Sequence, residues 1–324
     1  MSAALLAVED LATSFATDGG TLRAVDGVSF HVDAGEAIGI VGESGSGKSM
    51  TALSILRLVP NPGRITRGRI SLAGRDLLAL SEAAMRGVRR TEIAMIFQDA
   101  GAYLNPVMTV GEQIAEAIGP ARPRDAAARA RILAALSSVQ IADPARIARA
   151  YPHELSGGMQ QRVLIAAALI REPRLILADE PTTALDATVQ QQILACLADL
   201  RQRTGAALLL ISHDLAVVAQ ICDRLHIMYA GEIVEHGPVR EIFAAPKHPY
   251  TRALLDAILD PWQPPRALVP LDGAPPDMAA PPPGCRFHPR CPQAMAICAK
   301  TAPPARSFGD AHAARCWLNE EPVP

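Results

Sequence analysis

Short uninterrupted apolar runs recur along this chain, and each ends at a polar or glycine-containing turn. The runs lie at Ala37–Val41, Ile93–Phe97, Leu175–Ala178 and Leu208–Ile211. Apolar runs of this length, bounded by turn residues, are typical of strands that are buried on both faces of a parallel sheet. We therefore predict an α/β fold built on a parallel sheet.

A second pattern lies near the N-terminus. Residues 5–11, 28–33 and 69–73 are short segments of β-forming residues, separated by turn signals that include Gly19-Gly20. Such segments favour strands joined by tight turns. We expect an antiparallel β meander beside the parallel sheet.

Helical patterns occupy three further stretches. Residues 49–58 and 163–170 each follow a Gly/Ser-rich turn, and residues 109–139 carry Ala- and Arg-rich faces around Pro120–Pro123. The last of these stretches predicts an inserted helical subdomain, which we place at about residues 99–165.

Composition sets limits on the class of protein. A chain of 324 residues is long enough for one large α/β domain and an appendage, so we predict two domains, 1–240 and 241–324. A formal charge of −2 gives no general attraction to nucleic acid. The longest apolar run, Val163–Ile170, is far shorter than a membrane span, and residues 1–11 lack the basic start of a signal peptide. We expect a cytoplasmic protein that reaches a membrane only through partner proteins.

The segment Gly42-Glu43-Ser44-Gly45-Ser46-Gly47-Lys48-Ser49 matches the Walker A pattern of phosphate-binding loops. It lies between a predicted strand and a predicted helix, which is the context that the motif requires. The glycines let backbone N–H groups point at phosphate oxygens, and the helix adds the positive end of its dipole. Lys48 would reach the β- and γ-phosphates and Ser49 would bind Mg²⁺, so the chain is predicted to bind a nucleoside triphosphate.

Polar residues follow three of the other predicted strands: Gln98, then Asp179 with Glu180, then His213. The carboxyl ends of parallel strands meet at one edge of a sheet, where ligands bind. We predict that Asp179 and Gln98 bind Mg²⁺, that Glu180 deprotonates the attacking water, and that His213 senses the γ-phosphate. Gln98, Glu180 and His213 are thus the predicted catalytic residues.

The segment Ser156-Gly157-Gly158 precedes the apolar helix that contains Val163–Ile170, and it forms a second Ser/Gly-rich helix N-terminus. Its free N–H groups and Ser hydroxyl make a second site for an anion. The chain therefore carries two half-sites for phosphate. Phe15, on the first turn of the meander, is a candidate to stack on a nucleotide base, although a position in the core explains it equally well.

In this order, the motifs resemble those of the ATP-binding subunit of ABC transporters over residues 5–240. The matching segments are Gly42–Ser49, Gln98, Leu155–Arg162, Leu175–Glu180, Ala184-Leu185-Asp186 and His213. Other segments are similar to the D-type ATPase of dipeptide and oligopeptide importers: Phe97-Gln98, Leu104-Asn105-Pro106, Ala178–Asp186 and His248-Pro249-Tyr250-Thr251. The resemblance implies a P-loop ABC ATPase with a RecA-like sheet, followed by the C-terminal extension of oligopeptide transporters.

The resemblance also implies how the two half-sites are used. In this family two ATPase subunits pair head to tail, so that Ser156-Gly157-Gly158 and Asp186 of one subunit complete the ATP site of the other, while Phe15 stacks on adenine. The implied partners are an F-type ATPase subunit, two membrane permeases and a periplasmic peptide-binding protein. The implied location is peripheral, on the cytoplasmic face of the bacterial inner membrane. We expect the loop Gln98–Pro106 to contact the permeases, with Leu104 on the contact surface.

Two positions depart from the family's commoner residues, since Ala100 stands where relatives often have Pro and Met159 where ABC signatures in general have Gln. Alternative functions are a soluble ABC ATPase that acts on nucleic acid or the ribosome, a structural subunit with a degenerate site, and an importer of nickel complexes or glutathione. The residues that argue against degeneracy are Lys48, Asp179, Glu180 and His213. Neither a second cassette nor a long coiled-coil insertion, as found in the nucleic-acid class, is present.

The C-terminal part begins with a Pro-rich stretch, Pro261–Pro283, that predicts an extended linker. It is followed by Cys285, Cys291, Cys298 and Cys316. Five, six and seventeen residues separate successive cysteines, unlike the paired C-x₂-C knuckles of a zinc ribbon.

These four cysteines alone leave three explanations open: unrelated buried thiols, a zinc site in which His288 or His312 replaces a sulfur, and a [4Fe–4S] cluster. The resemblance favours the cluster, because some peptide-importer ATPases carry one in this region. The remaining cysteines, Cys196 and Cys222, are predicted to be ordinary buried thiols.

Overall fold

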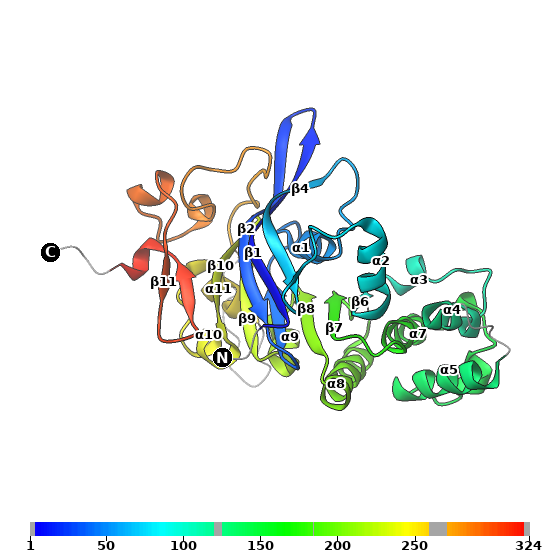
Figure 1. Ribbon diagram of the computed structural model, residues 1–324. Coiled ribbons are helices and arrows are strands. Elements are labelled where there is room, and N and C mark those ends of the chain that lie inside the picture. Colours follow the sequence, from blue (N-terminus) through cyan, green and yellow to red (C-terminus); the bar gives the residue numbers. More distant parts are fainter. Residues whose placement is uncertain (1–3, 120–124, 184, 259–270, 321–324) are drawn as a thin grey trace. The chain divides into compact units, whose positions relative to one another are not determined.

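A computed structural model describes residues 4–119, 125–183, 185–258 and 271–320 (Figure 1). Pro120–Pro123, Ala184 and the first part of the predicted Pro-rich linker lie outside these residues. The chain divides into two compact units. The first unit comprises Met1–Val32, Ala37–Leu78 and Ile211–Pro324, and the second comprises Asp33–Glu36 and Ala79–Leu210.

The first unit contains the predicted antiparallel meander. Its strands are β1 (Leu6–Thr17), β2 (Gly20–Val32), β4 (Arg64–Leu72) and β5 (Arg75–Asp76), in the order β2-β1-β4-β5. β1 and β2 are longer than the sequence pattern indicated, because bulges carry their pairing past Leu11 to the hairpin end. Phe15 therefore lies within β1, paired with Leu22, and the prediction that it lies on a turn was wrong.

The first unit also contains five strands of a second sheet, in which some neighbours are parallel and others antiparallel. These strands are β3 (Ala37–Val41), β9 (Arg224–Tyr229), β10 (Glu232–Pro238), β11 (Ala305–Ser307) and β12 (Ala313–Arg315), in the order β11-β12-β10-β9-β3. β3 and β9 are parallel, whereas the pairs β9–β10, β10–β12 and β11–β12 are antiparallel. The tight turn at Ala230-Gly231, where both residues have positive φ, reverses the chain between β9 and β10. The predicted parallel sheet is thus extended by antiparallel strands from the C-terminal part.

Four α-helices and three 3-10 helices complete the described part of the first unit. They are α1 (Lys48–Ile55), α9 (Leu215–Ile221), α10 (Val239–Ala244), α11 (Pro249–Asp256), η2 (His288–Arg290), η3 (Ala296–Ala299) and η4 (Trp317–Asn319). Residues 271–283 contain neither helix nor strand, as the prolines predict.

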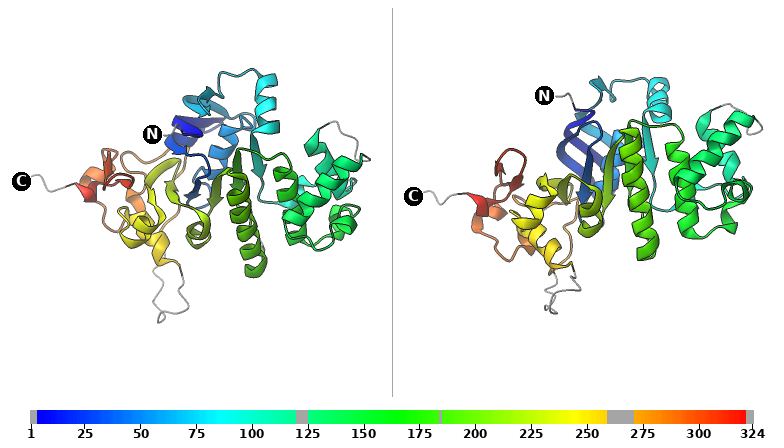
Figure 2. Two further views of the ribbon diagram at one scale, coloured as in Figure 1. Left: turned by 60° about the horizontal axis from the view of Figure 1, so that its bottom comes forward. Right: turned by 90° about the horizontal axis from the view of Figure 1, so that it is seen from below.

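The second unit has a parallel core and a helical cluster. Its strands are β6 (Ile93–Ile96), β7 (Leu175–Asp179) and β8 (Ala207–Ser212, of which residues 211–212 are assigned to the first unit), in the order β8-β7-β6. All residues of β7 and β8 are buried. The helices are α2 (Glu82–Thr91), α3 (Ala100–Tyr103), α4 (Val110–Ile118), α5 (Ala126–Ser138), α6 (Pro144–Ile147), η1 (Pro152–Glu154), α7 (Gly157–Leu169) and α8 (Ala187–Thr204). Helices α4, α5 and α7 pack against one another, and Figures 1 and 2 show them as one bundle.

Helix ends in the second unit follow local sequence signals. Thr109 and Glu112 form a reciprocal capping box at the start of α4, and Ser156 caps α7. Asp186 caps α8 by accepting a hydrogen bond from the N–H of Val189 at 2.9 Å. These caps fix where the helices begin and therefore where the predicted site residues lie.

Candidate functional site

The Walker A segment forms a tight loop between β3 and α1. Any Cβ at Gly42 would lie 2.1 Å from the carbonyl oxygen of Met228, and one at Gly47 would lie 2.2 Å from that of Ala24. Gly47 also has φ of 104°, which residues with a side chain rarely adopt. Only glycine is tolerated at these two positions, so the backbone of the loop is determined by its packing.

The loop presents donors at the start of α1. The N-cap residue Gly47 offers no side-chain cap, and a helix N-terminus of this kind favours an anion. Ser46 is 4% exposed, and its hydroxyl has no hydrogen-bond partner in the described part of the chain. A buried hydroxyl of this kind can donate to a phosphate oxygen.

Lys48 is 4% exposed and is oriented by the loop itself. Its ammonium group donates to the carbonyl oxygens of Gly42 at 2.8 Å and Glu43 at 2.9 Å. The next residue, Ser49, lies on the first turn of α1 and is half-buried. The loop therefore places a cation and a hydroxyl side by side, as phosphate and Mg²⁺ binding require.

Glu180 directly follows β7 and has a strained backbone, with φ of 45°. A positive φ at a residue with a long side chain is uncommon and points to a functional constraint. Its carboxylate accepts hydrogen bonds from Gln98 Nε2 at 3.2 Å and Thr183 Oγ1 at 2.9 Å. The structure thus brings together two of the predicted catalytic residues, and the sequence analysis missed the contribution of Thr183.

The other predicted residues around the γ-phosphate lie at strand ends. Asp179 is the last residue of β7 and is 8% exposed, next to Glu180 in the second unit. His213 follows β8, belongs to the first unit and is exposed. Each position matches the expectation that these residues follow buried strands.

The Ser156-Gly157-Gly158 segment differs from the Walker A loop in its exposure. Ser156 and Gly157 are exposed, and the Ser156 hydroxyl accepts a hydrogen bond from Met159 N–H at 3.4 Å. A Cβ at Gly158 would lie 2.8 Å from Val189 on α8, whereas one at Gly157 would meet nothing within 4 Å. The lack of a side chain at Gly158 therefore lets α7 pack closely against α8, whereas the space beside Gly157, at the start of α7, is open.

Gln161 connects α7 to the strand end that carries Gln98. This side chain is 3% exposed, and its Nε2 donates to the carbonyl oxygen of Phe97 at 3.3 Å. A displacement of α7 would therefore be transmitted to the residue before Gln98.

The loop after Gln98 differs from the prediction in one respect. Leu104 is 6% exposed, so the expectation that it lies on a contact surface was wrong. The exposed apolar side chains are Tyr103 at 54% and Val107 at 79%, and the Tyr103 ring stacks on Phe97 at 3.9 Å. These two residues are the ones that a partner protein could contact.

Phe15 is half-buried in β1, and its ring lies against Gly63. Packing against Gly63 explains part of its burial. The exposed part of the ring can still stack on a base.

All four C-terminal cysteines line one small pocket in the first unit. They are Cys285, Cys291, Cys298 and Cys316. Burial raises the pKa of Cys285 to about 11, and the neighbouring thiols Cys298, Cys316 and Cys291 add to this effect. Burial also raises the pKa values of Cys291 and Cys316. Among the described residues, no group of three or more His, Cys, Asp or Glu side chains is arranged to hold a single metal ion.

Two histidines that could replace a sulfur have different positions. His288 lines the cysteine pocket, and its Nδ1 lies 2.8 Å from the carbonyl oxygen of Cys285. His312 instead contacts Glu235 at 2.8 Å and does not line the cysteine pocket, so its proposed role as a zinc ligand was wrong. Cys196 and Cys222 are buried in other parts of the chain, as predicted.

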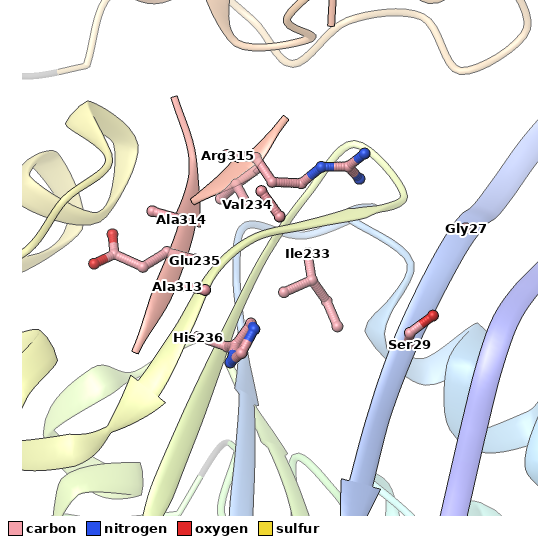
Figure 3. Close-up of a pocket in the computed structure, with 10 residues that line it drawn as sticks. Gly27, Ser29, Ile233, Val234, Glu235, His236, Ala313, Ala314 and Arg315 are labelled. Atoms are coloured by element: carbon pink, nitrogen blue, oxygen red, sulfur yellow. The ribbon is translucent and has the colours of Figure 1, made fainter. Parts of the chain in front are cut away.

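A larger pocket, of about 280 Å³, lies between β2, β10 and the β11–β12 hairpin (Figure 3). No predicted site residue lines it. Glu235, one of its lining residues, is 1% exposed and accepts hydrogen bonds from the N–H groups of Lys247 and His248. This carboxylate anchors the N-terminus of α11, which places Tyr250.

The sequence analysis missed two residues that contact the Walker A loop. Tyr250 accepts a hydrogen bond from the backbone N–H of Glu43 at 2.9 Å, and Arg290 donates to both carboxylate oxygens of Glu43, at 2.7 and 3.1 Å. These residues lie more than two hundred positions after Glu43 in the sequence. No local pattern connects them, although Tyr250 belongs to a motif used for the resemblance.

Comparisons with known proteins agree with this arrangement. The ABC transporter family matches residues 25–183, and the C-terminal region of oligopeptide/dipeptide transporters matches residues 234–298. The dipeptide transport ATP-binding protein DppD of Bacillus subtilis is 47% identical over 98% of this chain and 95% of its own length. The oligopeptide transport ATP-binding protein OppD of the same organism is 47% identical over 99% of this chain and 90% of its own.

The DppD protein of Escherichia coli is 45% identical over 97% of this chain and 96% of its own length. Among solved structures, the ATP-binding cassette MJ0796, in a dimeric post-hydrolysis state bound to ADP and phosphate, matches with a TM-score of 0.66 and 28% identity. The match covers 72% of this chain and 99% of the cassette. The resemblance inferred from the motifs is confirmed: the chain belongs to the ABC transporter ATP-binding proteins of the dipeptide and oligopeptide transport family.

Proposed function

We propose that this chain binds ATP with Mg²⁺ and hydrolyses ATP to power an importer of dipeptides or oligopeptides. The observation that carries the proposal is the combination of a complete Walker A loop with Glu180, whose backbone is strained and whose carboxylate accepts a hydrogen bond from Gln98. The family supports the transport role, because several relatives are named as dipeptide or oligopeptide transport ATP-binding proteins. ATP hydrolysis rather than binding alone is supported by the intact Glu180.

In this proposal, each residue of the site has a distinct role. The loop Gly42–Ser49 holds the phosphates with its N–H groups and Lys48, and Phe15 stacks on adenine. Ser49, Asp179 and Gln98 would hold Mg²⁺, which neutralises charge on the β- and γ-phosphates. Glu180 takes the proton of the attacking water, and the hydrogen bonds from Gln98 and Thr183 orient its carboxylate. His213 contacts the γ-phosphate.

The second half-site belongs to a partner ATPase. Ser156, Gly157 and Gly158 would bind the γ-phosphate held by the other subunit, and Asp186 would lie at the same junction. The exposure of Ser156 and Gly157 supports this, because a phosphate can approach them without displacing protein atoms. The partner is an F-type ATPase subunit, and the pair assembles with two permeases and a periplasmic peptide-binding protein.

The proposed place of the assembled complex is the inner membrane of a bacterium, with this subunit peripheral on the cytoplasmic face. No helix among the described residues is long and apolar enough to cross a membrane. Contact with the permeases would use Tyr103 and Val107 of the loop after Gln98. The proposed domains are the nucleotide-binding domain, 1–240, with a helical subdomain at residues 99–165, and the C-terminal extension, 241–324.

The C-terminal cysteines are proposed ligands of a [4Fe–4S] cluster, with zinc as the alternative. Four thiols that face one apolar pocket fit the donor set of such a cluster. When bound, the cluster would tie residues 285–316 together.

His248 gives independent support for a bound group in this pocket. It lines the pocket, is 1% exposed, and its Nε2 has no hydrogen-bond partner among the described residues. Burial lowers the pKa of His248 to about 3, so the ring is neutral, and its Nδ1 accepts from the N–H of Tyr250 at 3.1 Å. The ring proton is therefore on Nε2, where it can donate to a thiolate or sulfide sulfur.

The experiment that tests the proposed function is reconstitution of this chain with its neighbouring transporter subunits in proteoliposomes. We expect ATP hydrolysis that is stimulated by the peptide-loaded binding protein and accompanied by peptide uptake. Stimulation by nucleic acid or ribosomes, with no effect of permeases, would contradict the proposal.

A further inference from the structure

The Walker A loop is held from outside by residues of the C-terminal part, and the contact is centred on Glu43. The backbone N–H of Glu43 donates to the Tyr250 hydroxyl at 2.9 Å, and its carbonyl oxygen accepts from Lys48 Nζ at 2.9 Å. The backbone of a single residue, Glu43, therefore joins Tyr250 on one side to the phosphate-binding lysine on the other. Any shift of Tyr250 would move the carbonyl that orients Lys48.

The side chain of Glu43 is held as well. Arg290 donates to both carboxylate oxygens of Glu43, and it also donates to the Tyr229 hydroxyl at 3.3 Å and the Asp272 carbonyl oxygen at 3.1 Å. The Arg290 side chain is only 6% exposed. Burial alone would lower the pKa of Arg290, but the hydrogen bonds to Glu43 and Tyr229 raise it above its usual value, so the guanidinium stays charged. Paired, two-pronged contacts of this kind are both strong and directional.

A second contact reaches the loop at Ser46. The N–H of Gly231 donates to the Ser46 carbonyl oxygen at 2.9 Å. Arg286 holds this turn, since it donates to the carbonyl oxygen of Ala230 and pairs with Glu232 at 3.1 Å. The turn between β9 and β10 thus connects Arg286 to the middle of the Walker A loop.

Both arginines of these contacts lie in one short segment, residues 285–291. Arg286 and Arg290 lie inside it, and the ring of Phe287 packs against those of Tyr229 and Tyr250, with ring centroids 5.2 and 5.4 Å apart. The two ends of the segment are Cys285 and Cys291, which line the cysteine pocket. The ends of this segment thus belong to the cysteine pocket, its Arg290 pairs with Glu43 of the Walker A loop, and its Arg286 holds the turn that contacts Ser46.

We propose that Arg290 and Tyr250 are positioning residues for ATP binding, which act through Glu43 to fix the shape of the Walker A loop. The C-terminal extension is then part of the nucleotide site rather than an appendage. The proposal rests on the proposed function only in that the loop binds ATP. The ion pair also explains how a phosphate-binding loop can contain the negatively charged Glu43: Arg290 neutralises the Glu43 carboxylate.

The test is a double-mutant cycle in the full-length chain, read as the Kd of Mg·ATP. The variants are Arg290→Met, Glu43→Gln and the two combined. Arg290→Met should weaken ATP binding by about tenfold or more, because it frees the loop and leaves the Glu43 carboxylate unpaired next to the triphosphate. The double variant should bind ATP better than Arg290→Met alone, because no unpaired charge remains. Additive effects in this cycle would overturn the proposal.

Tyr250→Phe provides a milder test that keeps the aromatic packing. It removes only the oxygen that accepts from Glu43 N–H, so we expect a few-fold loss of ATP affinity with an unchanged Tm. Arg252→Met, on the same helix α11, is the matched control, because Arg252 donates to the Pro246 carbonyl oxygen and not to the loop. Its ATP affinity should equal that of the parent chain.

The outcomes separate this inference from the proposed function. A parent chain that does not bind ATP would contradict the proposed function. A parent chain that binds ATP, together with Arg290→Met and Tyr250→Phe variants of parental affinity, would overturn the positioning role alone. If Arg290→Met fails to fold, Tyr250→Phe and Glu43→Gln decide the question.

Discussion

The two proposed phosphate half-sites of this chain are built in opposite ways. The Walker A loop is packed on both sides, with Ser46 and Lys48 almost fully buried and its backbone held by the C-terminal part. The Ser156-Gly157 segment is exposed, and its hydroxyl contacts its own helix. The first half-site is therefore complete within the chain, whereas the second has the open surface that a partner's nucleotide would need.

This difference has a physical basis. A loop that must bind phosphate before assembly has to keep its N–H groups oriented without help, so many contacts stabilise one backbone conformation. A surface that binds only during assembly must stay accessible, and the cap at Ser156 is enough to order it. Variants of the first half-site should thus change the isolated subunit, and variants of the second only the assembled transporter.

The largest effect is expected at the catalytic carboxylate. Glu180→Gln keeps the hydrogen bonds from Gln98 and Thr183 but removes the base, so ATP turnover in the assembled transporter should fall by about a hundredfold or more while ATP still binds. Turnover is measured by phosphate release, and binding by titration. Glu172→Gln is a matched control, because Glu172 is exposed and also has a positive φ, of 53°. Parental turnover in Glu180→Gln would exclude Glu180 as the base.

The next effect concerns the first half-site. Lys48→Ala removes the buried ammonium group that contacts Gly42 and Glu43, so the isolated chain should lose ATP affinity by about tenfold or more. Turnover should fall with it. Lys300→Ala, at an exposed position, is the control. Unchanged affinity in Lys48→Ala would mean that this loop does not hold the nucleotide.

The second half-site offers the contrasting test. Gly157→Asp adds a negative side chain where no atom lies within 4 Å, so the chain should fold and bind ATP normally when isolated. In the assembled transporter the new carboxylate would repel the partner's γ-phosphate, and turnover should fall by about tenfold. Gly158→Ala should differ, because its Cβ would meet Val189 and destabilise the isolated chain. A normal turnover rate in the Gly157→Asp transporter would remove this segment from the ATP site.

The sequence predicted the two half-sites but not the contacts that hold the first one in place. Local motifs predicted both, because Gly-rich turns at the start of a helix leave a recognisable pattern. The contacts of Glu43 with Tyr250 and Arg290 could not be found, since they join residues far apart in the chain. Phe15 and Leu104 were misplaced for a related reason: strand length and burial depend on pairing partners, which local patterns do not contain.

The loop after Gln98 tests contact with the membrane partners. Val107→Glu changes a side chain that is 79% exposed, so the isolated chain should keep its Tm and ATP affinity while coupling of hydrolysis to transport decreases several-fold. Leu104→Glu places a charge in the interior and should lower the Tm instead. A Val107→Glu transporter with parental uptake would exclude this residue from the contact.

The smallest expected effect on ATP binding comes from the cysteine pocket, which borders the segment that holds the Walker A loop. Anaerobically purified protein should be brown and contain about four irons per chain, and Cys291→Ser should lose the iron. Because Arg290 precedes Cys291, we expect this variant to bind ATP a few-fold more weakly.

The raised pKa values of Cys285, Cys291 and Cys316 keep the thiols protonated near neutral pH in the metal-free chain. Metal uptake must therefore release protons and become tighter as pH rises, which titration of the metal-free chain at pH 6.5 and 8.5 can measure. A colourless anaerobic preparation with stoichiometric zinc would exclude the cluster but keep the four ligands, and uptake that does not depend on pH would contradict binding by these thiols.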